Sequence, residues 1–537
     1  MWLVDNGCLS SWFSSTTLWQ KGVALAVSFL VAVYWKIKPH YVPASLPGPQ
    51  RYPVIGFLLH VMKHWPHWPS ETARLASLHK TTYGGPLPNF GTLPGAYFYV
   101  HDEENLKFIL KDAFDCFGKS DVWQIALGEL LGEGIFAVDG KLWIHHRKIM
   151  ATMFSKNLLR STASVTHAKL NEVVQLLHDK FQKQAKEDKP RQTCEIDIQD
   201  LFFRLTMDVT ANFTFGVKLN SISRPEQHDF AKAFDELSML CQQRFQDPFC
   251  AITKYFKLTR NERRIRQLTG IVNDFALSII QHKRRSSDSQ EDGGSSSLGP
   301  DLLSRFLDQA HKTGEVISNQ ELRDIIMNII LAGRDTTAVA LSWTFYELTR
   351  NPKVVEKIVD EVHGICGVSG NTFEEDGNGD CSYDAISKLK YTHAVAMEVL
   401  RLHPPVPLDP RFALKECTLP DGTHIPAGAG VTLLFNTIAT SSKLWGDDAD
   451  QFRPERFLDG PKKNIEPSTF QYPIFNAGPR LCLGKPLALM NMKLAMAVLL
   501  PKFKFEDEVG HSGDYEWSLV QKMKDGFVVS VNCRDNN

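Results

Sequence analysis

The chain has 537 residues, of which 43% are hydrophobic and 23% are charged, so it can bury a substantial core and is not wholly disordered. Its formal net charge is -1 at pH 7, which lacks the basic excess that nucleic-acid-binding proteins use to neutralise phosphates. The ten cysteines form no CxxC pair, which disfavours both a paired-cysteine zinc site and a disulfide framework.

The first predicted element is an uncharged apolar segment from Gly22 to Trp35. It is shorter than the roughly 20 residues that span a bilayer and close to the length of a signal-peptide core, so both interpretations stay open. Bulky aromatic residues end the segment where a cleavage site would need small ones, which favours a retained membrane anchor. Lys36 and Lys38 follow it and place the rest of the chain in the cytosol. We therefore expect residues 1–38 to form an anchor with its flanks.

A proline-rich connector follows the predicted anchor. Its prolines fix an extended, kinked chain over residues 39–56, because proline has no amide donor and restricts the preceding residue. Beyond it we expect one domain over residues 57–537. Two stretches rich in Ser, Gly or acidic residues, 286–300 and 367–380, are predicted as solvated loops inside that domain, since helical patterns lie on both sides of each.

The longest predicted helix runs from Leu322 to Arg350. Ser318 and Glu321 form a capping box before it. The many apolar residues along this helix indicate that it crosses the core. Inside it, residues 332–338 have the sequence AGRDTTA, in which glycine and two threonines favour a local opening of the helix. The alternative is a close contact between helices that requires small residues.

Residues 392–402 and 485–500 also predict helices, which end before Pro404 and Pro501. Residues 413–434 instead contain short β-type runs separated by Asp-Gly and Ala-Gly turns. The expected fold class is therefore mostly α with a small β part.

A cysteine loop directly precedes the last of these helices, with the sequence FNAGPRLCLG from Phe475 to Gly484. The positive end of the helix dipole and the cation of Arg480 both favour the thiolate form of Cys482, which is the form that binds metal. Gly478 and Gly484 allow the backbone to approach a flat cofactor and leave amide groups free for the sulfur. An isolated cysteine would more often be an inert buried thiol.

This loop resembles the FxxGxRxCxG cysteine loop of the cytochrome P450 superfamily, and four other segments match that family in the same order. They are WxxxR at 143–147, AGRDTT at 332–337, ExxR at 398–401 and FRPERF at 452–457. The likeness spans about residues 43–530. It implies the cytochrome P450 fold with one N-terminal membrane anchor, and heme b as the cofactor.

The resemblance assigns Cys482 as the axial thiolate ligand of the heme iron, with Phe475 and Gly484 beside the heme. Guanidinium groups suit carboxylates, and an indole can donate a hydrogen bond to one. The residues expected to contact the heme propionates are Trp143, Arg147 and Arg480.

The remaining motif residues divide into a structural and a catalytic group. Glu398, Arg401 and Arg456 are expected to form a buried ionic cluster that supports the cysteine loop without a catalytic role. Thr336 and Asp335 are expected on the distal side of the iron, where the threonine hydroxyl helps to activate dioxygen and the aspartate links it to bulk water. The alternative for Thr336 is a hydroxyl that bonds its own helix backbone.

The resemblance implies a monooxygenase that inserts one oxygen atom from O2 into a C–H bond of a lipophilic substrate. The sequence shows no convincing flavin or nicotinamide motif, so NADPH electrons would come from a separate NADPH–cytochrome P450 reductase, with cytochrome b5 as a second donor. AGRDTTA and AGPRLCLGK resemble the fatty-acid and alkane ω-hydroxylase branches, which predicts fatty-acid ω-hydroxylation at the endoplasmic reticulum membrane. The alternatives are a monooxygenase of a sterol, terpenoid or xenobiotic, and a non-catalytic heme-binding sensor.

Overall fold

The computed structural model describes most of the chain after residue 40. The described ranges are 41–79, 82–90, 93–186, 193–247, 249–288, 301–304, 317–367, 382–458 and 467–534, with the single residues 28 and 307. The predicted anchor over 1–38 lies outside the described residues except for Ser28, and so does most of the two predicted loops. One helix continues to Asp288, three residues into the loop predicted at 286–300, so that boundary was wrong.

Helices form most of the fold, as the sequence predicted. In the first half they are α3 (Leu58–His64), α4 (Trp68–Leu78), α5 (Glu103–Lys107), α6 (Ser120–Leu131), α7 (Gly140–Met153), α8 (Lys156–Lys186), α9 (Ile198–Phe215), α10 (Asp229–Gln243), α11 (Cys250–Phe256) and α12 (Arg260–Asp288). In the second half they are α14 (Asn319–Ile330), α15 (Thr336–Arg350), α16 (Pro352–Cys366), α17 (Tyr383–Lys388), α18 (Lys390–Leu402), α19 (Phe435–Ala439), α20 (Ser442–Trp445) and α21 (Lys485–Leu499).

Short helical turns connect several of these helices and carry site residues. They include η1 (Trp65–His67), η4 (Arg244–Gln246), η5 (Leu331–Asp335), η6 (Pro454–Phe457), η7 (Pro473–Phe475) and η8 (Gly478–Arg480). The strands are β1 (Tyr83–Phe90), β2 (Leu93–Val100), β3 (Phe117–Gly118), β4 (Thr193–Asp197), β5 (Leu408–Ala413), β6 (Cys417–Thr418), β7 (His424–Ile425), β8 (Gly430–Leu434), β9 (Phe503–Glu506), β10 (Tyr515–Trp517), β11 (Gln521–Met523) and β12 (Val528–Cys533).

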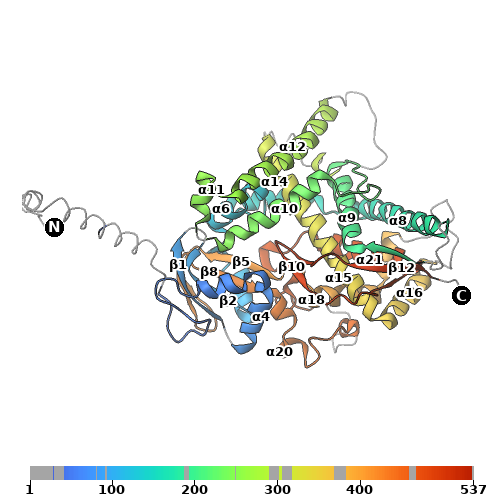
Figure 1. The fold of residues 1–537 in the computed structure, drawn as a ribbon. Helices are drawn as coiled ribbons and strands as arrows, with labels where there is room; N and C mark the ends of the chain where they lie inside the picture. Colours follow the sequence, from blue (N-terminus) through green and yellow to red (C-terminus); the bar gives the residue numbers. More distant parts are fainter. Residues whose placement is uncertain are drawn as a thin grey trace, which may run out of the picture.

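The largest described sheet lies at one end of the molecule, at the left in Figure 1, in the order β1-β2-β8-β5-β3. Strands β2 and β8 are parallel, and the other neighbours are antiparallel. Gly430 lies opposite Tyr97, and a Cβ atom at Gly430 would come within 2.5 Å of the tyrosine ring. Glycine is therefore required for this close strand contact. The predicted β part at 413–434 is confirmed by β6, β7 and β8.

The predicted long helix is confirmed and is interrupted where the sequence placed an opening. Ser318 caps α14 by accepting a hydrogen bond from the Glu321 amide at 3.1 Å. A π-helical turn, η5, then separates α14 from α15. The predicted alternative of a tight contact also holds, because a Cβ atom at Gly333 would lie 3.0 Å from Thr210 Oγ1 of α9. The glycine thus permits both the π turn and the packing against α9.

Helix α15 runs through the middle of the molecule, between α9, α18 and α21 (Figure 1). Its apolar residues Val339, Leu341, Trp343 and Phe345 are buried in one large cluster. Among the described residues, Asn319–Arg350 is the helical stretch that is long and apolar enough to cross a membrane, and 72% of its most apolar window is buried. This stretch is therefore a buried core helix, and the helix positions η5 inside the protein.

Candidate active site

The cysteine loop has a fixed shape that several close contacts determine. The Cys482 amide donates to the Phe475 carbonyl at 2.8 Å, which closes the loop between η7 and α21. Gly478 has a φ of +61°, and a Cβ atom there would lie 2.0 Å from the Leu110 carbonyl oxygen, so only glycine fits. Asn476 has a φ of 62° and a ψ of -175°, a conformation that residues other than glycine rarely adopt. The loop is therefore built to hold Cys482 in one position.

The sulfur of Cys482 lies among groups that favour its ionised form. Burial raises the pKa of the Cys482 thiol above its usual value, and the backbone amides of Gly484 and Lys485 and the cation of Arg147 oppose this rise only in part. The sequence had assigned the nearby cation to Arg480, whereas the structure gives this role to Arg147 of α7. A metal bound to the sulfur would overcome the effect of burial, because a coordinating thiol is deprotonated. Amide donors aimed at the sulfur would support such a ligand.

The three residues predicted at the propionates lie together beside the loop. Arg147 Nη2 donates to the Leu481 carbonyl at 2.5 Å, and the Arg480 guanidinium lies over the Trp143 ring at 4.7 Å. Arg480 also donates to Asp139 Oδ1 at 2.5 Å. Helix α7 therefore presents Trp143 and Arg147 to the same loop that carries Cys482.

A second charged group lies beside the loop, and the sequence reasoning missed it. Asp409 of β5 contacts Lys119 Nζ at 3.0 Å and Arg411 Nη2 at 2.6 Å, and it accepts a hydrogen bond from Asn476 Nδ2 at 2.9 Å. Burial and the like charge of Arg411 lower the pKa of Lys119 to about 7. No motif spacing marks these residues, since Lys119 and Asp409 come from distant parts of the chain.

The charges of this region fit a ligand with carboxylates, such as heme b. The cations of this region are those of Lys119, Arg411, Arg480 and Arg147, and the neighbouring carboxylates are those of Asp139 and Asp409. Burial and the positive charge of Arg411 lower the pKa of Arg480 to about 10. The cations named here therefore outnumber the carboxylates. The two propionates of a heme would balance this excess, while the Cys482 thiolate would hold its iron.

The distal turn η5 brings the predicted Asp335 and Thr336 into the core. Thr336 Oγ1 donates to the Ala332 carbonyl at 2.6 Å, which is the backbone bond that the sequence left as the alternative. Asp335 is 5% exposed and accepts from Arg334 Nη1 at 2.7 Å. Asp335 therefore does not lie at the surface. Burial raises the pKa of Asp335 to about 7, although the charge of Arg334 opposes this.

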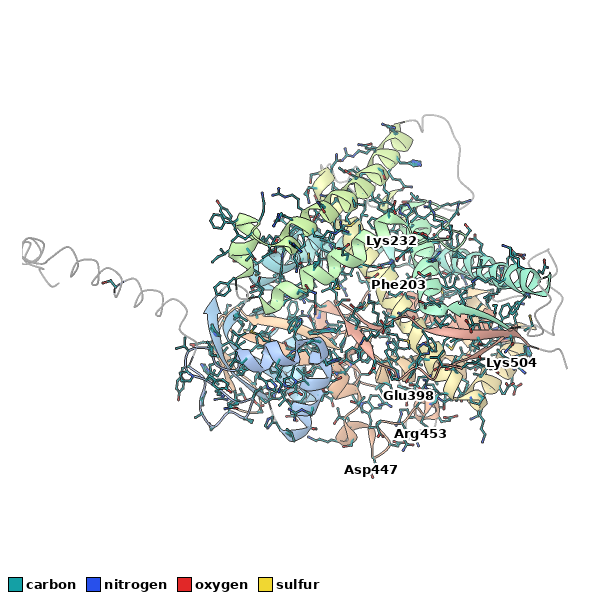
Figure 2. All side chains as sticks on the ribbon, viewed as in Figure 1. Phe203, Lys232, Glu398, Asp447, Arg453 and Lys504 are labelled. Atoms are coloured by element: carbon teal, nitrogen blue, oxygen red, sulfur yellow. The ribbon has the colours of Figure 1, made fainter. Side chains whose placement is uncertain are left out.

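The three residues predicted as structural form one buried cluster. Arg401 donates to Glu398 at 2.7 and 2.9 Å, and Arg456 Nε donates to Glu398 Oε1 at 2.8 Å. The backbone amide of Arg453 also donates to the Glu398 carboxylate, at 2.9 Å. Both residues are labelled in Figure 2. Tyr472 lies one residue before η7, and its hydroxyl donates to the carbonyl of Met397 in α18 at 2.8 Å. The cluster on α18 thus supports the segment that leads into the cysteine loop.

Apolar side chains from separate segments pack against one large hydrophobic cluster that also includes part of the turn η5. Trp123 of α6, Phe245 of η4 and Leu519 pack against the same cluster as Leu331 of η5. Trp123 and Phe245 are in edge contact, with ring centroids 6.1 Å apart.

A buried arginine fixes two of these segments. Arg244 of η4 donates to Glu129 of α6 at 2.6 Å and to Glu262 of α12 at 2.9 Å. Arg244 is 3% exposed, so both ion pairs are largely shielded from water. This pairing holds η4 against α6 and keeps Phe245 beside Trp123.

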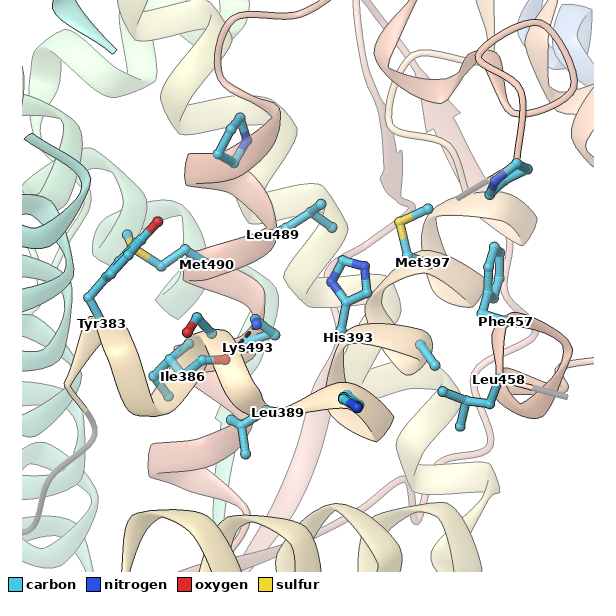
Figure 3. A pocket seen from close by; sticks show the side chains of 15 residues that line it. Tyr383, Ile386, Leu389, His393, Met397, Phe457, Leu458, Leu489, Met490 and Lys493 are labelled. Atoms are coloured by element: carbon cyan, nitrogen blue, oxygen red, sulfur yellow. Dashed lines mark hydrogen bonds between the residues drawn. The ribbon is translucent and has the colours of Figure 1, made fainter. Parts of the chain in front are cut away.

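A cavity of about 330 Å³ lies elsewhere, between α17, α18 and α21 (Figure 3). Tyr383, His393, Met397 and Met490 line it, and Lys493 donates to the Ile386 carbonyl at 2.5 Å within its wall. None of the predicted site residues lines this cavity. The chemistry predicted from the sequence is therefore not located there.

The closed hydrogen-bonded cysteine loop, the excess of cations beside it and the neighbouring Asp335 and Thr336 together define a heme-thiolate oxygenase. The family model of cytochrome P450 matches residues 46–528, and the chain belongs to the cytochrome P450 family. Cytochrome P450 704B1 of Arabidopsis thaliana is 32% identical over 515 residues, which cover 91% of this chain and 95% of the relative. Cytochrome P450 94A1 of Vicia sativa is 30% identical over 507 residues, which cover 91% of each chain.

Family membership settles the class of reaction. The chain is a cytochrome P450 monooxygenase that uses a heme with an axial thiolate, O2 and electrons from a separate redox partner. This confirms the predicted enzyme class and cofactor. It also removes the alternative of a heme-binding sensor without turnover.

Proposed function

We propose that this monooxygenase hydroxylates medium- or long-chain fatty acids at or near the methyl end. The observation that carries the proposal is that Leu331 of η5, in the same turn as Asp335, packs against the large apolar cluster to which Trp123 and Phe245 also pack. The similarity of AGRDTTA and AGPRLCLGK to the fatty-acid and alkane ω-hydroxylase branches supports the same substrate class.

Positioning must determine where oxidation occurs on such a chain. A terminal C–H bond is stronger than those of the neighbouring methylenes, so the intrinsic reactivity favours attack within the chain. A narrow apolar channel reverses this preference if only the methyl end reaches the reactive centre. The edge contact of Trp123 and Phe245, held in place by Arg244, would supply one constriction of this kind.

The residues beside the heme have distinct roles in the proposed reaction. Bound heme supplies the reductive activation of O2 and the transfer of one oxygen atom to carbon. Cys482 would hold the iron, while Arg147, Arg480 and Lys119 would bind the propionates, with Asp409 positioning Lys119. The overall reaction consumes the alkyl C–H bond, O2, NADPH and one proton, and it yields an alcohol, water and NADP+.

In the proposed reaction, Asp335 and Thr336 would supply the protons. Arg334 binds Oδ1 of Asp335 and leaves Oδ2 to carry the exchangeable proton. A carboxyl with a pKa of about 7 both releases and regains a proton at neutral pH, which suits general acid–base work. The Thr336 hydroxyl donates to the Ala332 carbonyl, and its lone pairs accept a hydrogen bond on the distal side. These two groups would deliver protons in a fixed direction.

The proposed location is the endoplasmic reticulum membrane, with residues 1–38 as the anchor, 39–56 as the connector and 57–537 as the cytosolic domain. The described part of the connector contains turns and a bridge between Tyr52 and Gly56. Exposed apolar side chains on and around α11 support contact with lipid. They are Phe249, Ile252, Tyr255, Phe256 and Leu258. NADPH–cytochrome P450 reductase is the proposed electron donor, with cytochrome b5 as a second one.

The substrate proposal is tested by reconstitution with the reductase, NADPH and fatty acids of several lengths. Mass spectrometry then locates the new hydroxyl group. Products oxidised at or near the methyl end would support the proposal, and exclusive mid-chain oxidation would contradict the regiochemistry. Turnover of a sterol or terpenoid without turnover of any fatty acid would contradict the substrate class.

The location is tested with a variant that lacks residues 2–36. We expect weaker membrane association and unchanged heme incorporation, because the described domain folds from residue 41 onward. Full-length protein isolated from cells should retain its N-terminal segment. A mature N-terminus after Trp35 would instead establish a cleaved signal peptide.

A further inference from the structure

Two histidines and a glutamate converge where α3 meets α4, among side chains to which the oxygenase chemistry gives no role. His60 and His64 lie four residues apart on α3, and Glu71 lies in the first turn of α4. One ligand atom from each of the three residues lies within 4.8 Å of those of the other two. The imidazole rings of His60 and His64 are 4.5 Å apart. This is the spacing by which one helix face offers two nitrogen ligands to a metal ion.

The local sequence produces this arrangement through the turn between the helices. Pro66 lies in η1 and favours the change of direction that follows α3. Trp65 of η1 lies against Trp517 at 4.8 Å, and Trp68 of α4 packs in edge contact with Tyr99 at 5.9 Å. These aromatic contacts fix η1 and α4 on the body of the domain. Glu71, which is 7% exposed, therefore faces α3 from a rigid support.

One nitrogen in the cluster lacks a hydrogen bond. His60 Nε2 is buried and makes no hydrogen bond of acceptable geometry, although Glu71 Oε1 is 2.9 Å away. A buried polar atom without a partner costs about 1–3 kcal/mol in general, so such atoms are uncommon in folded proteins. A cation bound between this nitrogen and the carboxylate would give the nitrogen a partner.

We propose that His60, His64 and Glu71 form a binding site for Zn²⁺. Two imidazoles and one carboxylate are a ligand set that zinc accepts, with water in the fourth position. Burial lowers the pKa of His60, and hydrogen bonding to Arg74 lowers the pKa of Glu71. Both directions favour the forms that bind metal, which are the neutral imidazole and the carboxylate.

The site requires small side-chain adjustments. Ligand atoms around tetrahedral zinc lie roughly 3.3 Å apart, given metal–ligand distances of about 2.0–2.1 Å. The His60–Glu71 contact of 2.9 Å would widen slightly, and the His64 ring would rotate toward them. Arg74 donates to both oxygens of Glu71 at 2.8 and 2.7 Å, which orients the carboxylate as outer-sphere hydrogen bonds do in metal sites.

Zinc bound here would join α3 to α4. Helix α3 contributes Leu58 and Val61 to the apolar cluster under the large sheet, and α4 contributes Trp68 and Leu75. A ligand that binds the folded arrangement stabilises it by mass action. The expected consequence is a more stable N-terminal part of the domain, separate from the heme and its thiolate.

The test is calorimetric titration of the heme-loaded protein with Zn²⁺ alone, in a buffer that does not chelate the ion. We expect one saturable site, and at least ~10-fold weaker binding in His60→Ala and in His64→Ala, in line with the losses that metal-site substitutions cause. His67→Ala is the matched control, since His67 lies in the adjacent turn η1 outside the cluster. The carbonyl spectrum of the heme verifies that each variant is folded.

Two further measurements complete the test. Zn²⁺ should raise the midpoint of thermal unfolding in the parent protein and in His67→Ala, and should leave that of His64→Ala unchanged. If His60→Ala does not fold, His60→Gln replaces it, because glutamine keeps a polar side chain and is a poor zinc ligand. Equal Zn²⁺ affinity in the parent protein and in both cluster variants would overturn the proposal, as would anomalous diffraction that places the ion elsewhere.

Discussion

Arg334 of η5 donates two hydrogen bonds to Asp235 of α10, at 2.5 and 3.0 Å. The Arg334 side chain is fully buried, and its guanidinium also lies over the Phe203 ring at 4.8 Å. Because Arg334 binds Asp335 as well, the same guanidinium joins the distal turn to a neighbouring helix. The position of the proposed proton donor thus depends on a residue of α10.

The first prediction concerns this link. Asp235→Ala removes one acceptor of a buried guanidinium, so the free energy of unfolding should fall by about 1–3 kcal/mol. Urea denaturation of the heme-loaded protein measures this change. Lys232→Ala on the same helix is the control, because Lys232 is exposed in an ion pair with Glu226 and should change stability little. Equal effects of the two substitutions would contradict the proposed importance of the Arg334 contact.

The second prediction concerns pH. Burial raises the pKa of Asp335 to about 7, so the carboxyl is protonated below this pH and ionised above it. If the protonated form supplies the proton, the yield of product per NADPH consumed should fall as the pH rises through about 7. Asp335→Asn should give a low yield without this inflection. An unchanged pH profile in the variant would assign the titrating group elsewhere.

The same shift predicts the effect of Asp335 on stability. Between the ordinary value of 3.8 and about 7, the folded state binds more protons at Asp335 than the unfolded state does. The free energy of unfolding should therefore decrease as the pH rises across this range. Asp335→Asn should remove that contribution, which denaturant titrations at several pH values can measure.

The third prediction concerns Thr336. Its hydroxyl bonds the Ala332 carbonyl at 2.6 Å, so Thr336→Ala removes a polar group from the distal turn without a large change in volume. We expect more hydrogen peroxide per NADPH consumed, because protons would arrive without positional control. Thr336→Ser should restore much of the coupling, since it keeps the hydroxyl. Unchanged coupling in Thr336→Ala would leave the hydroxyl with only its bond to the helix backbone.

Local patterns in the sequence predicted much of this architecture. The π turn at η5 follows from a glycine and two threonines inside an apolar helix, and the cysteine loop follows from its glycines and the helix behind it. Both depend on residues that are close in sequence. The mostly helical class and the small sheet at 413–434 were predictable for the same reason.

Contacts between distant residues were not predictable. Lys119 and Asp409 are 290 positions apart, and Arg334 and Asp235 are 99 positions apart. No periodicity relates such residues, since only the packed core brings them together. From the sequence, Arg480 was predicted to be the cation that favours the Cys482 thiolate. In the structure, the packing of α7 places Arg147 where its charge lowers the pKa of Cys482.

The fourth prediction concerns the iron ligand. Among the described cysteines, Cys482 is the one in the closed loop whose sulfur receives the amides of Gly484 and Lys485. Cys482→Ser should abolish the thiolate-type Soret shift of the ferrous carbonyl complex. Cys116→Ser is a matched control, because Cys116 lies in a different turn beside β3 and should leave the spectrum unchanged. A thiolate-type spectrum in Cys482→Ser would assign the ligand to another cysteine.

The last prediction concerns the conformation of Asn476. Its φ of 62° with ψ of -175° falls in a region suited to glycine, which costs another residue about 1–3 kcal/mol. Its side chain offsets this cost, because Nδ2 donates to Asp409 at 2.9 Å and Oδ1 accepts from the Ala477 amide at 2.8 Å. A hydrogen bond to a charged group contributes about 1.5–3 kcal/mol, so the two effects are similar in size.

Two substitutions at Asn476 separate the strain from the hydrogen bonds. Asn476→Ala keeps the strained backbone and loses both bonds, so its free energy of unfolding should fall by roughly 2–4 kcal/mol. Asn476→Gly loses the same bonds but relieves the strain, so it should lie within about 1 kcal/mol of the parent protein. Urea denaturation and the rate of heme loss measure both variants. Equal destabilisation by alanine and glycine would show that the Asp409 bond, and not the backbone conformation, determines the stability of the cysteine loop.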